Sequence, residues 1–113
     1  MFLRTFWERV RPRIMARESV ELDPVEQLSL RFLLSHGRTT EESLHTEVNS
    51  TRAASALDVH DALARLEGLG LVESRIRFEG DQSRAFFSPS GRATKLKGRI
   101  PLEPQTVTEF YLC

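Results

Sequence analysis

The stretch that decides the fold spans residues 59–72 and reads VHDALARLEGLGLV. Its apolar residues recur at intervals of three and four as far as Leu66, which is the spacing of one buried helix face. Gly68 and Gly70 then end the helix, because glycine readily adopts the positive φ found at many helix ends. The face that we expect to be buried consists of Val59, Ala62, Leu63, Leu66 and Leu69.

After Gly70 the apolar period changes from helical to two, which predicts a strand with one buried face. The polar cluster at residues 79–83 predicts a hairpin loop, residues 84–88 the returning strand, and residues 89–91 its end. On the first strand, Val72, Ser74, Ile76 and Phe78 alternate with Glu73, Arg75 and Arg77.

A long helix is predicted upstream, beginning at Asp23. Asp23 is the N-cap, Pro24 takes the first helical position and Glu26 completes a capping box, while Gly37 ends the helix as a left-handed cap. Val25, Leu28, Phe32 and Leu33 lie on one side of this helix, and Leu30 and Leu34 lie on the other. We therefore expect the helix to be buried on both sides.

A shorter helix follows it. Thr39 and Glu42 form a second capping box, and Leu44 with Val48 supplies a modest apolar face. Residues 49–54 predict a turn, after which Ser55 or Ser50 caps the next helix, which runs to about Glu67.

Helix, turn, helix and hairpin in this order resemble the winged helix-turn-helix. Residues 59–72 look like the recognition helix and its exit, where a leucine pair leads into a Gly-Leu-Val that opens the wing. Residues 86–92 resemble the aromatic-Thr-Pro-x-Gly-Arg segment that closes the wing, with Ser88 in place of the usual Thr. The resemblance covers roughly residues 22–97 and is to bacterial regulators of the MarR and PadR types. It implies an α+β, mainly α domain with a three-helix core and a two-stranded wing.

The N-terminal arm, residues 1–20, precedes the winged-helix domain of residues 21–99. It carries an amphipathic stripe with Phe2 beside it, although Pro12 should kink the helix. The arm is interpreted as a helix packed on the body or on a twin subunit, as a basic membrane-surface helix, or as a disordered arm. Packing is favoured because the helix that begins at Asp23 needs a cover, for which the Trp7 stripe is the obvious choice. The predicted dimer or partner contact comprises Leu3, Phe6, Trp7, Val10 and Ile14. The tail, residues 100–113, adds to a sheet edge or remains an arm.

Composition limits the class of protein. The chain has 113 residues, 40% hydrophobic and 28% charged, with a formal net charge of zero. No apolar run approaches the ~18 residues of a membrane span, and four arginines and one glutamate among the first 13 residues interrupt any signal-peptide pattern. The single cysteine, Cys113, allows no internal disulfide, so a reducing cytoplasm is the expected location.

Charge is nevertheless unevenly distributed along the chain. Residues 1–17 hold five arginines and one acid, residues 18–70 four arginines and ten acids, and residues 71–99 seven basic residues and three acids. An acidic body is thus flanked by basic segments.

We predict double-stranded DNA as the partner, bound mainly through the wing. Opposite its buried face, the recognition helix carries Leu57, Asp61 and Arg65, and only Arg65 offers a bidentate guanine contact. Basic residues of the wing and beyond form a stripe that would neutralise phosphates. The expected contacts are Ser55, His60, Arg65, Arg75, Arg77, Arg84, Arg92 and Lys95. The plainer alternative is that these charges solvate the wing and pair with the acidic body.

A second class is a protein-interaction module, in which the acidic recognition-helix face with Leu57 docks a partner. An enzyme is not expected. The three histidines, His36, His45 and His60, lack metal-ligand spacing, and no glycine-rich phosphate loop or triad is present. We expect no metal and no cofactor, and a homodimer is the expected assembly.

Overall fold

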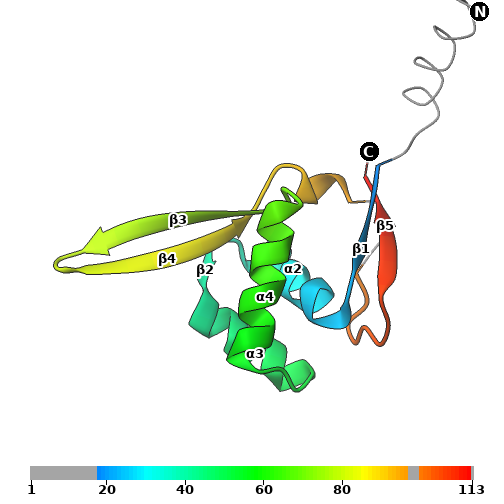
Figure 1. The fold of residues 1–113 in the computed structure, drawn as a ribbon, viewed down its shortest axis with the longest axis horizontal. Coiled ribbons are helices and arrows are strands. Elements are labelled where there is room, and N and C mark those ends of the chain that lie inside the picture. Colours follow the sequence, from blue (N-terminus) through cyan, green and yellow to red (C-terminus); the bar gives the residue numbers. More distant parts are fainter. Residues whose placement is uncertain (1–17, 97–99, 113) are drawn as a thin grey trace, which may run out of the picture.

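The computed structural model describes residues 18–96 and 100–112. Three helices form the body, a β-hairpin projects from one side of it, and a two-stranded sheet lies on the other side (Figure 1). The elements in chain order are β1 (Ser19–Leu22), α2 (Pro24–His36), β2 (Thr39–Thr40), α3 (Glu41–Thr51), α4 (Ala56–Gly68), β3 (Val72–Glu79), β4 (Gln82–Pro89), the 3-10 turn η1 (Ala93–Lys95) and β5 (Thr108–Tyr111). This is the predicted winged helix.

Each of the three helices begins at a residue whose side chain caps a free backbone amide of the first turn. At α2 the Asp23 amide donates to Glu26 Oε1 at 2.8 Å and the Glu26 amide donates to Asp23 Oδ1 at 2.8 Å, so the predicted capping box is confirmed. Ser55 caps α4 in the same reciprocal way with Asp58. At α3 the predicted cap was one residue off: Thr40 is the N-cap, because Thr39 and Thr40 pair with β4 as strand β2.

The helix ends differ slightly from expectation. Gly37 has the required positive φ of 80°, but its ψ of −132° is outside the left-handed helical region that we predicted. The helix α3 continues to Thr51, so that the turn before α4 is shorter than residues 49–54.

The core lies between α2, α3 and α4. The predicted inner face of α4 is confirmed, with Val59, Leu63 and Leu66 almost fully buried and Leu69 partly buried. Leu28 and Leu33 of α2 and Leu44 and Val48 of α3 complete this layer. Because each buried leucine or valine contributes about 1.5–3 kcal/mol, this local pattern stabilises the body strongly.

The strands of the wing are longer than the sequence predicted, and their apolar side chains are more exposed. β3 and β4 pair in register from Val72↔Pro89 to Glu79↔Gln82, which leaves Gly80 and Asp81 as a tight turn in place of a five-residue loop. The prediction of a buried strand face was wrong beyond Val72, because Ile76 is 66% and Phe78 80% exposed. The hairpin extends past the helices, so no second layer covers these side chains (Figure 1).

The wing is fixed to α4 at the segment that resembles winged-helix regulators. Leu71 is fully buried, and its carbonyl accepts from the Ser90 amide at 2.9 Å. The Ser90 hydroxyl donates to the Gly70 carbonyl, and Gly70 has a φ of 76°. The entry and exit of the wing are thereby joined, which sets the direction of the hairpin relative to α4.

A two-stranded sheet lies against the second side of α2; its strand β5 is the sheet-forming alternative for the tail, whereas β1 was not predicted. β1 pairs antiparallel with β5, from Ser19↔Tyr111 to Leu22↔Thr108, and buries Val20 and Phe110 in the core. Leu30 is fully buried among the described residues, so it does not need the N-terminal stripe as a cover; Leu34 remains 39% exposed. The stripe itself, from Leu3 to Ile14, lies outside the described residues. None of the described helices is long and apolar enough to cross a membrane.

Candidate nucleic-acid interface

One face of the wing gathers arginines. Arg77 lies directly opposite Arg84 in the register, and Arg75 lies directly opposite Phe86. Directly opposed residues of an antiparallel pair project to the same face, as do residues two apart on one strand. Arg75, Arg77 and Arg84 therefore share a face, and all three are exposed. By the same rule Glu73 and Glu79 also lie on this face, next to Arg75 and Arg77 along β3. Arg77 and Arg84 are a like-charged pair directly opposite each other, an arrangement that costs stability unless a counter-charge is near.

A fourth arginine belongs to this face and was missed from sequence. The guanidinium carbon of Arg38 lies 4.9 Å from the centre of the Phe86 ring, which is cation–π geometry. Arg38 reaches the wing because β2, which follows it, pairs with β4 at Phe86 and Phe87. No local signal could reveal this, because Arg38 and Phe86 meet only through strand pairing. We call Arg38, Arg75, Arg77 and Arg84 the cationic wing face.

The outer face of α4 is different in character. His60 Nδ1 lies 2.8 Å from Glu41 Oε1 at the start of α3, and Leu57 is 65% exposed. Hydrogen bonds from the backbone and then the side chain of Ser55 hold the pKa of Asp58 below its usual value. Ser55 is therefore occupied as a cap, and Asp58 keeps its charge.

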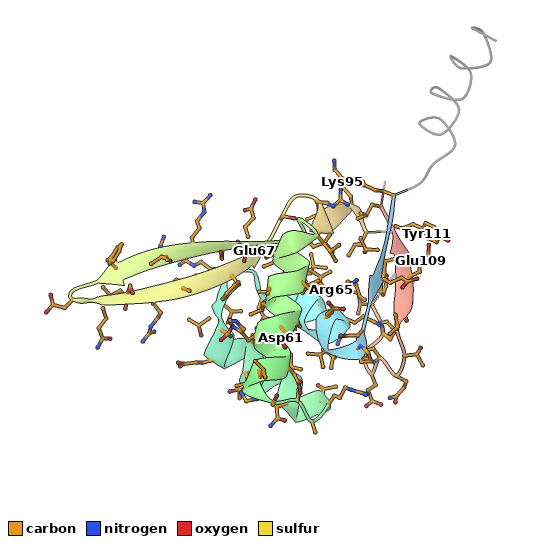
Figure 2. The ribbon with its side chains drawn as sticks, in the orientation of Figure 1. Asp61, Arg65, Glu67, Lys95, Glu109 and Tyr111 are labelled. Atoms are coloured by element: carbon orange, nitrogen blue, oxygen red, sulfur yellow. The ribbon has the colours of Figure 1, made fainter. Side chains whose placement is uncertain are left out.

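Arg65 points away from the wing, toward β1 and the start of α2 (Figure 2). Its Nη1 donates to Glu26 Oε1 at 2.6 Å and to the Glu21 carbonyl at 2.8 Å. The hydrogen bond with Glu26 raises the pKa of Arg65 above its usual value. Because the Glu26 side chain is only 3% exposed, Arg65 is the compensating charge for a buried carboxylate.

Arg92 and Lys95 also lie apart from the cationic wing face. Arg92 Nη2 forms an ion pair with Glu18 Oε1 at 2.8 Å, and this hydrogen bond lowers the pKa of Glu18. Lys95 lies on η1, at the side of the body away from the wing tip (Figure 2). The predicted contacts thus divide into a wing group, an α4 group that comprises Ser55 and His60, and a distant group of Arg65, Arg92 and Lys95.

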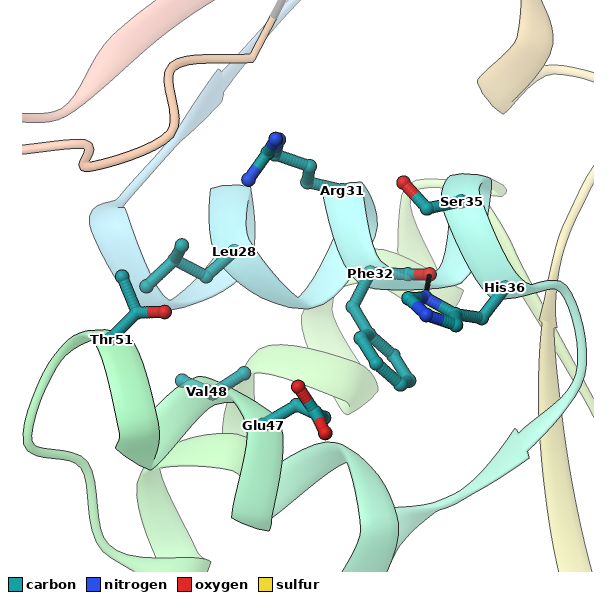
Figure 3. Close-up of a pocket in the computed structure, with 8 residues that line it drawn as sticks. All are labelled: Leu28, Arg31, Phe32, Ser35, His36, Glu47, Val48 and Thr51. Atoms are coloured by element: carbon teal, nitrogen blue, oxygen red, sulfur yellow. Dashed lines mark hydrogen bonds between the residues drawn. The ribbon is translucent and has the colours of Figure 1, made fainter.

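A small pocket lies between α2 and α3 (Figure 3). The rings of Phe32 and His36 stack inside it at 4.2 Å between centres, with Glu47 across from them. Its volume of about 200 Å³ is below the roughly 300–1,000 Å³ of typical small-molecule sites. In the part of the chain that the structure describes, no cluster of three or more metal-binding side chains occurs.

Comparisons with known proteins agree on the fold. No family model matches the sequence, and no curated protein sequence matches it. Among solved structures, Stf76 from the Sulfolobus islandicus plasmid-virus pSSVx is similar, with a TM-score of 0.52 and 21% identity over 62% of this chain and 86% of that chain. A zinc-responsive MarR family member, ZitR of Lactococcus lactis, has a TM-score of 0.56 and 16% identity over 82% of this chain. The match spans 64% of the ZitR chain, just under two thirds. The chain thus has the winged helix-turn-helix fold, and its structural neighbours include a member of the MarR family.

Proposed function

We propose that this chain is a DNA-binding transcriptional regulator whose wing supplies most of the contact with the duplex. The observation that carries the proposal is the cationic wing face, where Arg77 lies directly opposite Arg84 and the four arginines outnumber the two acids of the same face, Glu73 and Glu79. A polyanion relieves that repulsion, and release of its counterions drives binding.

The recognition helix has a smaller part in this proposal. Of its candidate contacts, His60 is paired with Glu41 and Arg65 with Glu26. Asp58 and Asp61 on the same helix repel phosphates, although an acid can accept a hydrogen bond from cytosine. Ser55 and His60 remain secondary contacts, while Arg92 and Lys95, which lie apart from the cationic wing face, have no part in this proposal.

The salt dependence of duplex binding tests the proposal. If the four arginines of the cationic wing face each neutralise one phosphate, the logarithm of the binding constant falls with the logarithm of salt concentration with a slope of about −3.6. The double variant Arg75→Ala, Arg77→Ala should weaken binding to all duplexes alike and reduce the slope by about 1.8. Fluorescence anisotropy on a random-sequence duplex measures both quantities.

Lys95→Ala is the matched control, because it removes one exposed positive charge away from the wing. We expect it to change the slope much less than Arg84→Ala does. Equal effects would mean that binding follows total charge and that the cationic wing face has no special role. No duplex affinity even at low salt would rule out DNA binding altogether.

A protein-interaction module is the second candidate function. It is favoured by the outer face of α4, where exposed Leu57 precedes Asp58 and lies about one turn before Asp61. If the wild-type chain has no duplex affinity, this acidic face is the surface on which to seek a protein partner.

We also propose a homodimer, because two-fold symmetric regulators present two wings to one duplex. The mass of the chain in solution, measured with and without a duplex, tests the assembly. The predicted contact through Leu3, Phe6, Trp7, Val10 and Ile14 remains untested, since these residues lie outside the described part of the chain.

A further inference from the structure

An apolar groove runs between α2 and η1, on the side of α2 that faces away from α3. Its volume is about 570 Å³, larger than that of the pocket in Figure 3. The apolar side chains that line it include Leu34 and Leu102, which are 39% and 67% exposed. Leu96, Ile100 and Ala93 also contribute to its lining, and Arg31 and Ser35 lie at its α2 side.

The N-terminal end of the described chain lies beside this groove. Glu18 is held there twice, by its ion pair with Arg92 at 2.8 Å and by its carbonyl, which accepts from the Leu112 amide at 2.8 Å. Arg92 directly precedes Ala93, which lines the groove. The arm that precedes Glu18 therefore joins the body next to an apolar surface.

The sequence of the arm matches such a surface in size and chemistry. Leu3, Trp7, Val10 and Ile14 form a stripe that would be about 18 Å long in a helix. Three residues, 15–17, link this stripe to Glu18, and three extended residues span about 10 Å. Glu8 is the single acid of residues 1–17 against five arginines, and the groove itself contains Arg31, so the match lies in the apolar side chains and not in the charges.

We propose that the groove between α2 and η1 is the docking site for the N-terminal stripe of the same chain. The exposed leucines of the groove then cover Trp7 and its neighbours. Of the two packed arrangements expected from sequence, on the body or on a twin subunit, the proposal takes packing on the body. This inference is independent of DNA binding by the wing. It makes the arm an intramolecular element, and a dimer contact would use another surface.

Trp7 provides the test, because it is the single tryptophan of the chain. In the full-length protein we expect a blue-shifted Trp7 emission that iodide quenches poorly, independent of protein concentration. Leu34→Glu and Leu102→Glu should move the emission to that of a free peptide of residues 1–17 and increase quenching several-fold. Both side chains are already partly exposed, so neither change should unfold the body.

Leu57→Glu is the matched control, since Leu57 is 65% exposed on α4 and lies outside the groove. It should leave the Trp7 emission unchanged. Emission that equals that of the free peptide in the wild-type protein would overturn the proposal. A blue shift that appears only as protein concentration and solution mass rise together would also overturn it, because a second copy would then cover Trp7.

Discussion

At the residue scale, the pairing of Arg65 with Glu26 decides what Arg65 is available to do. Glu26 is buried at the start of α2, where its Oε1 accepts from both the Asp23 amide and Arg65. Removal of Arg65 leaves that carboxylate with one fewer partner, so we expect Arg65→Ala to lower the free energy of unfolding by about 2 kcal/mol. Urea denaturation measures this, and duplex binding of the folded variant should change little. Unchanged stability with lost sequence preference would instead identify Arg65 as a base-reading residue.

At the element scale, the N-terminus of α4 depends on a charged cap. The pKa of Asp58 is lowered by its hydrogen bonds with Ser55, so its contribution to stability is present above its ordinary pKa of 3.8 and is lost as pH falls through the lowered value. Asp58→Asn should therefore flatten the loss of stability in acid. The test compares thermal unfolding at neutral pH and below pH 3.8, with Asp61→Asn on the same helix as control. An equal acid response in the Asp58 variant and the wild type would contradict a charged cap.

At the scale of the whole molecule, the pairing of β1 with β5 joins the two ends of the described chain across α2. Gln27 reinforces it, because its Nε2 donates to the Leu22 carbonyl at 2.8 Å and to the Thr106 carbonyl at 2.9 Å. Phe110 on β5 is 5% exposed and its neighbour Tyr111 is 45% exposed. We expect Phe110→Ala to lower the free energy of unfolding by about 3 kcal/mol and Tyr111→Ala by less than about 1 kcal/mol. Equal, small effects in chemical denaturation would mean that the tail contributes little and that residues 21–99 suffice for folding.

The sequence by itself determined the features that depend on near neighbours. The capping box at Asp23, the inner face of α4 and the positive φ of Gly70 were all predictable, because each is set by residues within one or two turns. The cap of α4 was narrowed to Ser55 or Ser50, and the structure shows Ser55 in a capping box with Asp58. The resemblance of residues 59–72 and 86–92 to winged-helix regulators predicted that these elements assemble into a three-helix core with a two-stranded wing. It also gave the fold before any long-range contact was known.

Only the tertiary structure decided which faces are covered and which charges are free. Alternation in β3 predicted an apolar face, but burial needs a second layer, and the hairpin extends past the helices. Nothing in the local sequence distinguishes Arg65 from Arg38. Arg65 binds Glu26, which is 39 positions away, whereas Arg38 packs on the ring of Phe86 in the wing. The β1–β5 sheet likewise joins segments about ninety residues apart. Such contacts depend on pairing between distant parts of the chain, on which local spacing and capping carry no information.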